Sequence, residues 1–409
     1  MKLKLNQTRD LKVNASIRIT GSKSETNRLL LLQALYPSIR IHNLSNSDDG
    51  HVMQNGLQTG SGEVDIHHAG TAMRFLTAFF ASQEGKKVVL TGSSRMKERP
   101  IQVLVNALKS IGADIEYVQK AGYPPLRISG KKLLKNKVAL PANVSSQYIS
   151  ALLLIAPRLQ HGLELELMGK ITSVPYIKMT LSLLEQVGIQ TSFEDHSIRV
   201  WPKQSVPPIS MTVESDWSSA SYFYSVMALS EIGSRMQISS YKSDSLQGDS
   251  ILQKIYASFG VETSFSENIV TLRKIQDHSA AYFEYDLSNA PDLAQTISVT
   301  CFGLKIGCHL TGLHTLPIKE TDRLAALQTE LTKLGAQIET DSESLTMKAS
   351  EVIHQNVAID TYHDHRMAMA FAPLAFRTSL CINDAEVVSK SYPDFWKDLQ
   401  TTGVNIEKC

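Results

Sequence analysis

The sequence has little of what marks secreted, membrane-spanning or nucleic-acid-wrapping proteins. Its four cysteines, none of them in a CxxC pair, predict no disulfide framework among 409 residues. Lys and Arg total 41 and Asp and Glu total 40, so the net charge of +1 lacks the basic excess that wrapping nucleic acid requires. The longest apolar stretch, residues 149–156, is far shorter than the ~20 residues that cross a bilayer. Together with the polar start MKLKLNQTRD, which has no apolar signal core, these features lead us to expect a cytoplasmic globular protein.

Common cofactor and nucleophile motifs are also absent. There is no GxxxxGK[ST] loop and no GxGxxG at the start of a helix, so the usual ATP and dinucleotide fingerprints are missing. No GxSxG elbow is present, and the cysteines have no recognisable nucleophile context. His67 and His68 are adjacent and His363 and His365 flank an aspartate, so neither pair has the i,i+4 spacing of two ligands on one helix face. We therefore expect no metal site.

A repeated pattern organises the chain, whose length suits two to three domains at roughly 150 residues each. An amphipathic helix ends at a glycine, where the chain can turn left-handed, and alternating apolar residues then predict a strand. Five clear copies have glycines 68 to 76 residues apart, and a degraded copy precedes the first of them by 52. The glycines are Gly60, Gly112, Gly188, Gly260, Gly335 and Gly403.

Each repeat also holds an upstream helix that is strongly apolar and should be buried. These helices are expected within residues 24–36, 71–81, 145–156, 218–230, 292–303 and 364–376. The repeats are longer than a usual solenoid unit and suit two globular α/β domains of three repeats each.

Polar and charged residues gather at the starts of the helices. They are GSKS (21–24), GT (70–71) with Arg74, SSQ (145–147), DHR (364–366) and KETDR (319–323), the last expected to open a long helix of the fifth repeat. A helix N-terminus favours anions, so a cation there is unfavourable by up to about 1 kcal/mol until a negative group binds. Such cations would repel one another across an open cleft. The pattern indicates a site for a small polyanion.

Each feature also has a plainer interpretation that the residues alone leave open. Ser145 or Ser146 could be the N-cap of a capping box. Lys319 and Arg323 could form surface pairs with neighbouring acids. The basic segment SRMKERP (94–100) could be a solvated loop, and Asp292 could be an ordinary first-turn acid.

Motifs along nearly the whole chain, in collinear order, resemble those of the 5-enolpyruvylshikimate-3-phosphate synthase family. The matching segments are GSKSETNR (21–28), HAGTAMR (68–74), RMKERP (95–100), YPPLR (123–127), SSQY (145–148), PYI (175–177), VESDWSSASYF (213–223), QGD (247–249), APD (290–292), KETDRL (319–324), DHRMAM (364–369) and KSYPDF (390–395). KETDR and DHRMAM are highly specific to this family.

The resemblance implies a carboxyvinyl transferase of the shikimate pathway, which leads to chorismate and the aromatic amino acids. Such an enzyme transfers the enolpyruvyl group of phosphoenolpyruvate to the 5-hydroxyl of shikimate 3-phosphate and releases phosphate. The reaction adds the hydroxyl to give a tetrahedral intermediate and then eliminates phosphate, with no cofactor or metal. The implied partners are these two small molecules, without nucleic acid or membrane, and the chain would be a monomer.

The resemblance also implies an α/β fold of two domains, each of three βαβαββ units, with the ligand site in the cleft between them. One domain would span residues 21–214 and carry much of the shikimate 3-phosphate site. The other would join residues 1–20 to 215–409 and carry most of the catalytic groups. The hinge would fall near Thr20 and Glu214, and the domains would close on substrate.

The resemblance assigns the site residues position by position. Asp292 would accept the proton of the attacking hydroxyl and Glu320 would protonate the methylene carbon, with Lys23 and Lys319 as further catalytic groups. Shikimate 3-phosphate would be bound by Lys23, Ser24, Arg28, Ser145, Ser146, Gln147, Ser173, Asp292 and Lys319. Phosphoenolpyruvate would be bound by Lys23, Gly70, Arg99, Gln147, Arg323, Arg366 and Lys390. Planar guanidinium groups suit its phosphate and its carboxylate.

The chain departs from the family pattern at several positions. Only 16 residues lie between His51 and His68, where the family has a longer segment that forms a strand pair and its connection. His68 and Phe75 stand where the family usually has Asn and Pro, and Thr315 and Pro317 replace a frequent Asn and Arg. None of these changes removes a proposed catalytic group.

Two other functions remain open at this point. An enolpyruvyl transferase that acts on UDP-N-acetylglucosamine shares the fold and the donor, but it usually carries a reactive cysteine in its first domain. Residues 21–214 contain no cysteine. The second alternative is a non-catalytic homologue that binds a phosphorylated ligand, against which the presence of Asp292 and Glu320 argues.

Overall fold

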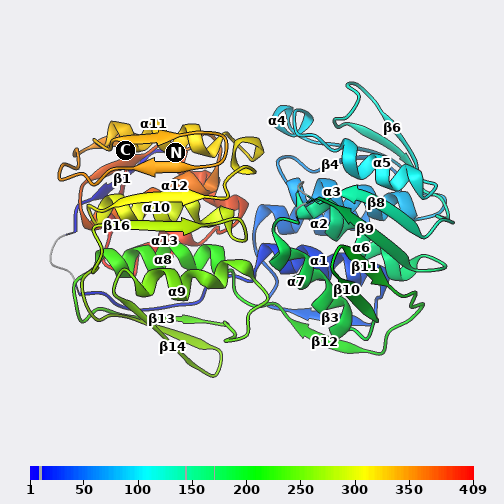
Figure 1. The fold of residues 1–409 in the computed structure, drawn as a ribbon, viewed down its shortest axis with the longest axis horizontal. Coiled ribbons are helices and arrows are strands. Elements are labelled where there is room, and N and C mark those ends of the chain that lie inside the picture. The colour runs from blue at the N-terminus through cyan, green and yellow to red at the C-terminus, as the bar shows by residue number, and fades with distance from the viewer. Residues whose placement is uncertain (9–11, 143–144, 170) are drawn as a thin grey trace. The chain divides into compact units, whose positions relative to one another are not determined.

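The chain divides into two compact units. A computed structural model describes residues 1–8, 12–142, 145–169 and 171–409. The continuous unit is Gly21–Val213, and the discontinuous unit joins Met1–Thr20 to Glu214–Cys409 (Figure 1). The chain thus leaves the discontinuous unit after Thr20 and returns at Glu214, one residue before the boundary expected from the sequence.

Three helices form the core of the continuous unit: α1 (Lys23–Leu35), α3 (Gly70–Ser82) and α6 (Ser146–Ile155). They contact one another, and nearly all of their residues are buried. The outer helices are α2 (Asp48–Gln58), α5 (Gln102–Ser110) and α7 (Val174–Gln186), with the short α4 (Ser94–Lys97) and the 3₁₀ turn η1 (Ala156–Arg158). Because the core helices are apolar on nearly all faces, only the centre of the unit can bury them.

Three sheets surround this core. One has the order β4-β5-β7-β6, with β4 (Gly62–Asp65), β5 (Lys87–Thr91), β6 (Asp114–Tyr117) and β7 (Leu126–Ser129). The next has the order β10-β11-β9-β8, with β8 (Lys137–Pro141), β9 (Leu163–Met168), β10 (Thr191–Glu194) and β11 (Ser197–Val200). The third has two strands, β3 (Ile39–His42) and β12 (Ile209–Thr212). The two-stranded sheet belongs to the repeat that is short in the sequence.

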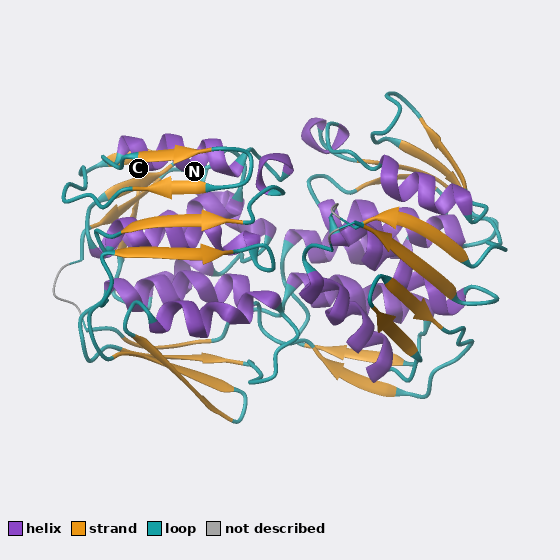
Figure 2. Ribbon diagram, in the orientation of Figure 1, coloured by secondary structure: helices purple, strands orange, loops and turns teal. Residues whose placement is uncertain are grey.

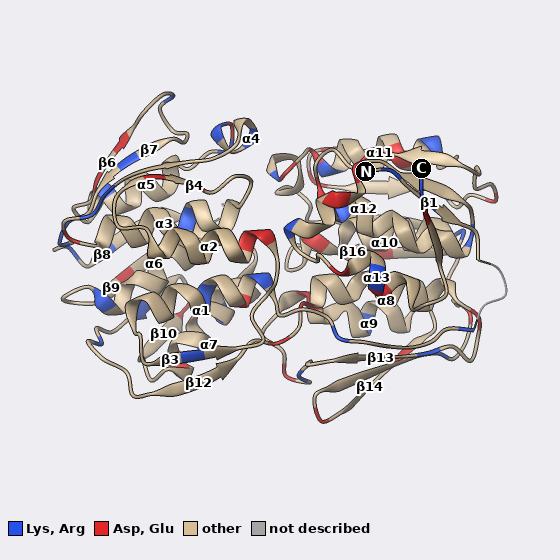
Figure 3. Cartoon of the chain, turned by 180° about the vertical axis from the view of Figure 1, so that it is seen from behind, with Lys and Arg blue, Asp and Glu red and all other residues tan. Residues whose placement is uncertain are grey.

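The discontinuous unit repeats this plan around α8 (Trp217–Leu229), α10 (Ala294–Gly303) and α12 (His365–Phe371). Helices α8 and α10 run side by side and carry no Lys, Arg, Asp or Glu, so Figure 3 draws them in tan. The outer helices are α9 (Leu252–Ala257), α11 (Arg323–Lys333) and α13 (Phe395–Gln400). The 3₁₀ turns are η2 (Gly248–Ile251), η3 (Pro291–Leu293), η4 (Leu316–Ile318), η5 (Ala372–Phe376) and η6 (Ala385–Lys390).

Three four-stranded sheets cover these helices, and Figure 2 shows helices and strands as separate layers of the unit. The first has the order β14-β15-β13-β2, with β2 (Asn14–Ile17), β13 (Arg235–Ser239), β14 (Val261–Ser266) and β15 (Ile269–Lys274). The second has the order β16-β17-β19-β18, with β16 (Tyr282–Asp286), β17 (Gly307–Thr311), β18 (Ile338–Thr340) and β19 (Leu345–Met347). The third has the order β20-β21-β1-β22, with β1 (Leu3–Asn6), β20 (Val357–Ile359), β21 (Leu380–Ile382) and β22 (Asn405–Lys408).

The strands pair in one recurring way. A core helix connects two parallel strands, as α3 connects β4 to β5 and α10 connects β16 to β17, and an antiparallel hairpin completes the sheet. In two sheets, the strand that pairs in parallel comes from a distant part of the chain. Strand β2 pairs in parallel with β13, with Ile17 opposite Ile238, and β12 pairs in parallel with β3, with Ile209 opposite Ile39. These distant strands are the segments that precede the two crossings between the units.

Five of the six repeat glycines end their helices as the sequence predicts. They have φ between +77° and +113° and are followed by β6, β10, β14, β18 and β22. Because only glycine adopts this conformation without strain, the helix stops there. The prediction for the sixth glycine, Gly60, is wrong, because its φ is not in the left-handed range. The left-handed residue is Gly62, with φ +97°. Gly62 is the first residue of β4, which is not a hairpin strand.

Candidate active site

The discontinuous unit gathers its predicted site residues into one ion-paired network centred on Asp292. This residue lies in η3, directly before α10, and its side chain is 19% exposed. Its Oδ1 accepts a hydrogen bond from Arg323 Nη1 at 2.8 Å and lies 3.4 Å from Lys319 Nζ. Its Oδ2 accepts from Arg366 Nη2 at 3.0 Å. One carboxylate is therefore held by three cations.

Arg323 connects three carboxylates. Its Nε donates to Asp364 Oδ2 at 2.7 Å, its Nη1 to Asp292 Oδ1, and its Nη2 to Glu320 Oε2 at 2.8 Å. The side chain is 2% exposed, which a guanidinium tolerates only when its charge is compensated. Burial would lower the pKa of Arg323, but the three carboxylates together raise it above its usual value.

The local sequence explains where Arg323 lies. It is the first residue of α11, and the N-cap Asp322 accepts hydrogen bonds from Leu324 N and Ala325 N, both at 3.1 Å. A capped first turn fixes the direction of the side chain at its first position. Asp364 does the same for Arg366, since its Oδ1 accepts from Arg366 N at 2.9 Å at the start of α12.

Glu320 lies between two cations. Its Oε2 accepts from Arg323, and its Oε1 accepts from Lys390 Nζ, which belongs to η6, at 3.2 Å. Four predicted cations and two predicted carboxylates thus come together from η3, the segment before α11, α11 itself, α12 and η6. The charges of the network control the pKa of Asp292. Burial would raise that pKa, but Arg366, Lys319 and Arg323 hold it well below its usual range, so the group is a carboxylate at neutral pH.

One expectation for this region is wrong. Lys319 and Glu320 do not open the long helix: α11 begins at Arg323, and both residues lie in the segment before it. Each of the four cations of this network pairs with a carboxylate of its own unit; the cations are Arg323, Arg366, Lys319 and Lys390. The sequence showed the cations and indicated Glu320 as a neighbouring acid, but it could not show that Asp292 and Asp364 would reach the same guanidinium.

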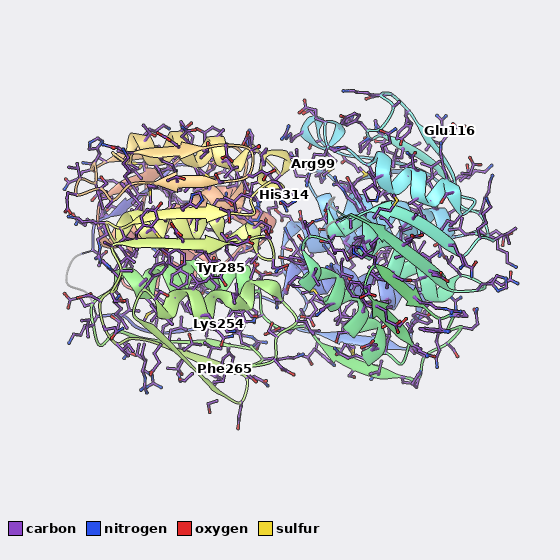
Figure 4. All side chains as sticks on the ribbon, viewed as in Figure 1. Arg99, Glu116, Lys254, Phe265, Tyr285 and His314 are labelled. Carbon is purple, nitrogen blue, oxygen red and sulfur yellow. The ribbon has the colours of Figure 1, made fainter. Side chains whose placement is uncertain are left out.

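In the continuous unit, Gly70 and Arg99 lie against each other. Gly70 is the first residue of α3, and a Cβ there would lie 2.6 Å from Arg99 Nη1 and 3.0 Å from its Cζ. Arg99, labelled in Figure 4, belongs to the segment between α4 and α5. Arg74 holds this segment, since its Nη1 donates to Gly70 O at 3.0 Å and its Nη2 to Pro100 O at 3.2 Å. Tyr148 Oη also donates to Pro100 O, at 2.6 Å. These hydrogen bonds therefore hold the backbone that follows Arg99 against α3 and α6, and the guanidinium of Arg99 lies beside Gly70.

The starts of α3 and α6 are joined as well. Ser145 is the N-cap of α6, and its Oγ accepts from Gln147 N at 3.4 Å, so the capping interpretation of this motif applies. Gln147 Nε2 donates to Thr71 Oγ1 at 3.2 Å. Ser146 is buried at the first position of α6. Ser173, at the start of α7, is left-handed with φ +54° and partly exposed.

Lys23 and Arg28 on α1 differ in their surroundings. Lys23, the first residue of the helix, pairs with Asp49 of α2 at 3.0 Å, a partner that sequence reasoning missed. Ser24 follows it in the first turn and supplies a carbonyl to Arg28 Nη1 at 2.7 Å. Arg28 is buried and also donates to Thr180 Oγ1 at 2.8 Å and Ser150 Oγ at 3.0 Å. Its guanidinium therefore ties α1 to α6 and α7, and burial lowers its pKa to about 10.

Other features add no further candidate centre. Among the described residues, no group of three or more His, Cys, Asp or Glu could hold a metal ion. No helix in the described part of the chain is long and apolar enough to cross a membrane. A cavity of about 630 Å³ beside Asp277 and Arg377 contains none of the predicted site residues. The chemistry available at the described clusters is therefore that of cations for binding anions and of carboxylates for moving protons.

Comparisons with known proteins agree with this chemistry. The family model described as EPSP synthase (3-phosphoshikimate 1-carboxyvinyltransferase) matches residues 52–399. A 3-phosphoshikimate 1-carboxyvinyltransferase of Bacteroides fragilis (strain YCH46) is 45% identical over 400 residues, which cover 97% of each chain. One of Aliivibrio fischeri (strain ATCC 700601 / ES114) is 36% identical over 419 residues, with 95% of this chain and 97% of the relative covered. The solved EPSP synthase of Acinetobacter baumannii shares the fold, with a TM-score of 0.79 over 99% of each chain at 18% identity.

Proposed function

The chain belongs to the EPSP synthase family, and we propose that it transfers the enolpyruvyl group of phosphoenolpyruvate to the 5-hydroxyl of shikimate 3-phosphate through the network centred on Asp292. It is a carboxyvinyl transferase of the shikimate pathway. The observation that carries the proposal is the carboxylate of Asp292 held by Arg323, Arg366 and Lys319, with Glu320 on the same guanidinium. This arrangement joins proton-transfer groups to anion-binding groups within one unit.

We assign the proton transfers to the two partly exposed carboxylates. Asp292 takes the proton of the 5-hydroxyl as its oxygen bonds to C2 of phosphoenolpyruvate, and Glu320 gives a proton to C3. In the second step the C2–O bond to phosphate breaks, Glu320 recovers a proton from the methyl carbon, and Asp292 gives the hydroxyl proton to the departing phosphate. The hydroxyl hydrogen thus leaves with the phosphate, the enol ether remains, and both carboxyl groups return to their starting states.

The cations explain how a weakly basic Asp292 can act as a base. Its pKa lies well below its usual range because Arg366, Lys319 and Arg323 stabilise the carboxylate. A ligand with phosphate and carboxylate groups competes for the same guanidinium and ammonium groups. As these turn toward the ligand, their hold on Asp292 weakens and its proton affinity rises. Substrate binding and activation of the base are therefore one event in this proposal.

The remaining binding roles go to residues of both units. In the discontinuous unit, Arg323, Arg366 and Lys390 bind the phosphate and carboxylate of phosphoenolpyruvate. In the continuous unit, Gly70 and Arg99 bind the same substrate, and the missing Cβ lets the guanidinium lie against the start of α3. Shikimate 3-phosphate is assigned to Lys23, Ser24, Arg28, Ser145, Ser146, Gln147 and Ser173. Arg28 acts here mainly by fixing α1 to α6 and α7, because its side chain already donates to all of these elements.

Phosphate release tests the function and separates it from the alternatives. Purified protein with shikimate 3-phosphate and phosphoenolpyruvate should release one phosphate for each carboxyvinyl product. Phosphoenolpyruvate alone, or with UDP-N-acetylglucosamine, should release none. Release with the amino sugar would assign the chain to the other transferase. Absence of release, with shikimate 3-phosphate still bound, would make it a non-catalytic homologue.

A further inference from the structure

A second buried carboxylate lies beside the network without belonging to the proposed site. Asp249 in η2 is 2% exposed. Its Oδ2 accepts a hydrogen bond from Ser218 Oγ, whereas its Oδ1 has no hydrogen-bond partner within the described residues. A buried carboxylate with an unsatisfied oxygen is destabilising for the fold. Its presence therefore points to a use other than stability.

Ser218 connects this carboxylate to the network. It is the second residue of α8, and its Oγ accepts from Arg366 Nη2 at 3.3 Å while donating to Asp249. The same Nη2 donates to Asp292 Oδ2 at 3.0 Å, and Nη1 approaches Asp292 O at 3.4 Å. The guanidinium of Arg366 thus lies between two carboxylates, one in direct contact and one reached through the serine.

We propose that Asp249, acting through Ser218, is a positioning residue that holds Arg366 in the orientation that binds phosphoenolpyruvate. The inference rests on the proposed function, in which Arg366 binds that substrate and Asp292 takes up a proton. When Asp292 becomes neutral, the charge attraction of its side chain for Arg366 is lost, and the guanidinium is then restrained by Ser218 with Asp249 on one side and by the backbone carbonyl of Asp292 on the other. A restrained guanidinium keeps the geometry that a planar anion requires.

The charges that face Asp249 come from three neighbouring elements. Burial raises its pKa to about 6, Arg366 of α12 lowers it, and Asp292 of η3 and the α8 N-cap Asp216 raise it. The hydrogen bond from Ser218 also lowers it. Asp249 is therefore negative above a pH of about 6 and loses this charge below it. The restraint on Arg366 should follow the same pH dependence.

The test compares Asp249→Asn with the wild type. The variant keeps the shape and an acceptor for Ser218 but removes the charge. At pH 8, the KM of the variant for phosphoenolpyruvate should be about tenfold that of the wild type, the size expected for losing one charged hydrogen-bonding partner. Its KM for shikimate 3-phosphate should stay within about twofold of the wild-type value. At pH 5.5, where most wild-type Asp249 is already neutral, the ratio between variant and wild type should fall to about threefold. Asp244→Asn, an exposed acid in the preceding segment, is the matched control and should change neither constant.

A second variant keeps the test decisive if Asp249→Asn folds poorly. Ser218→Ala removes the bridge and leaves the carboxylate, and it should raise the KM for phosphoenolpyruvate in the same direction. Equal changes in the KM values for the two substrates would show a purely structural role and overturn the inference. The same conclusion would follow if the ratio of the variant KM to the wild-type KM for phosphoenolpyruvate did not change with pH. A wild-type protein that releases no phosphate would instead overturn the proposed function, so the two failures are distinguishable.

Discussion

At the scale of single residues, the proposed base is the most strongly restrained carboxylate of the network. Three cations contact Asp292, and two of them, Arg323 and Arg366, are nearly buried. Asp292→Asn should lower kcat by about 10²–10⁴-fold, the usual contribution of a general base, and leave both KM values nearly unchanged. Steady-state phosphate release measures both quantities. A variant that keeps more than about a third of wild-type turnover would remove Asp292 from this role.

Gly70 offers a residue-scale test within the continuous unit. Its φ is not in the left-handed range, so alanine costs no backbone strain, and the new methyl group meets only the end of a flexible side chain, Arg99. Gly70→Ala should therefore leave Tm almost unchanged while raising the KM for phosphoenolpyruvate much more than that for shikimate 3-phosphate. Equal changes in the two KM values would show that the glycine serves the fold instead.

Single residues also show where sequence reasoning ends. The cations were found because Lys or Arg near a helix start is unusual. Two of their partners were not found: Asp364 is an N-cap and Asp49 a first-turn acid by position, and only folding brings them within 3.0 Å of Arg323 and Lys23. The ligand role of Arg28 stays a prediction, whereas its hydrogen bonds to Thr180 and Ser150 could not be read from the sequence.

At the scale of elements, apolar periodicity was sufficient for the core helices and insufficient for the sheets. All six buried helices were predicted within a few residues. The pairing of β2 with β13 and of β12 with β3 was not predicted, because a strand of four residues carries no signal for a partner far away in the chain. Gly60 was misassigned because the shortened repeat has no hairpin after α2, and its sheet has two strands instead of four.

The N-cap of α11 provides the element-scale prediction. Asp322 accepts from two backbone N–H groups, so Asp322→Ala should cost about 1 kcal/mol. Thermal unfolding should show Tm lower by roughly 2–4 °C. Because Arg323 is the first residue of this helix, kcat/KM should also fall. Asp322→Asn keeps a capping oxygen and is the control. Equal loss in both variants would mean that the charge of Asp322, rather than the cap, matters.

At the scale of the whole molecule, binding of shikimate 3-phosphate should stabilise the folded state. Saturation at 100 times Kd contributes about 2.7 kcal/mol. At roughly 2–4 °C per kcal/mol for domains of this size, Tm should rise by roughly 5–10 °C, and by less as salt screens the cations. Phosphoenolpyruvate should add to the shift, and Lys23→Ala should reduce it. If millimolar shikimate 3-phosphate at low salt left Tm unchanged, the result would contradict both the anion site and the proposed function.

The mass of the product formed in D₂O tests the addition–elimination chemistry of the whole enzyme most directly. If Glu320 protonates C3 and later recovers a proton from the same carbon, the methylene becomes a methyl group that contains solvent deuterium. After return to H₂O to remove exchangeable label, most product molecules should carry deuterium on the vinyl carbon, with one phosphate released for each. A product that forms at the normal rate without carbon-bound deuterium would contradict this mechanism.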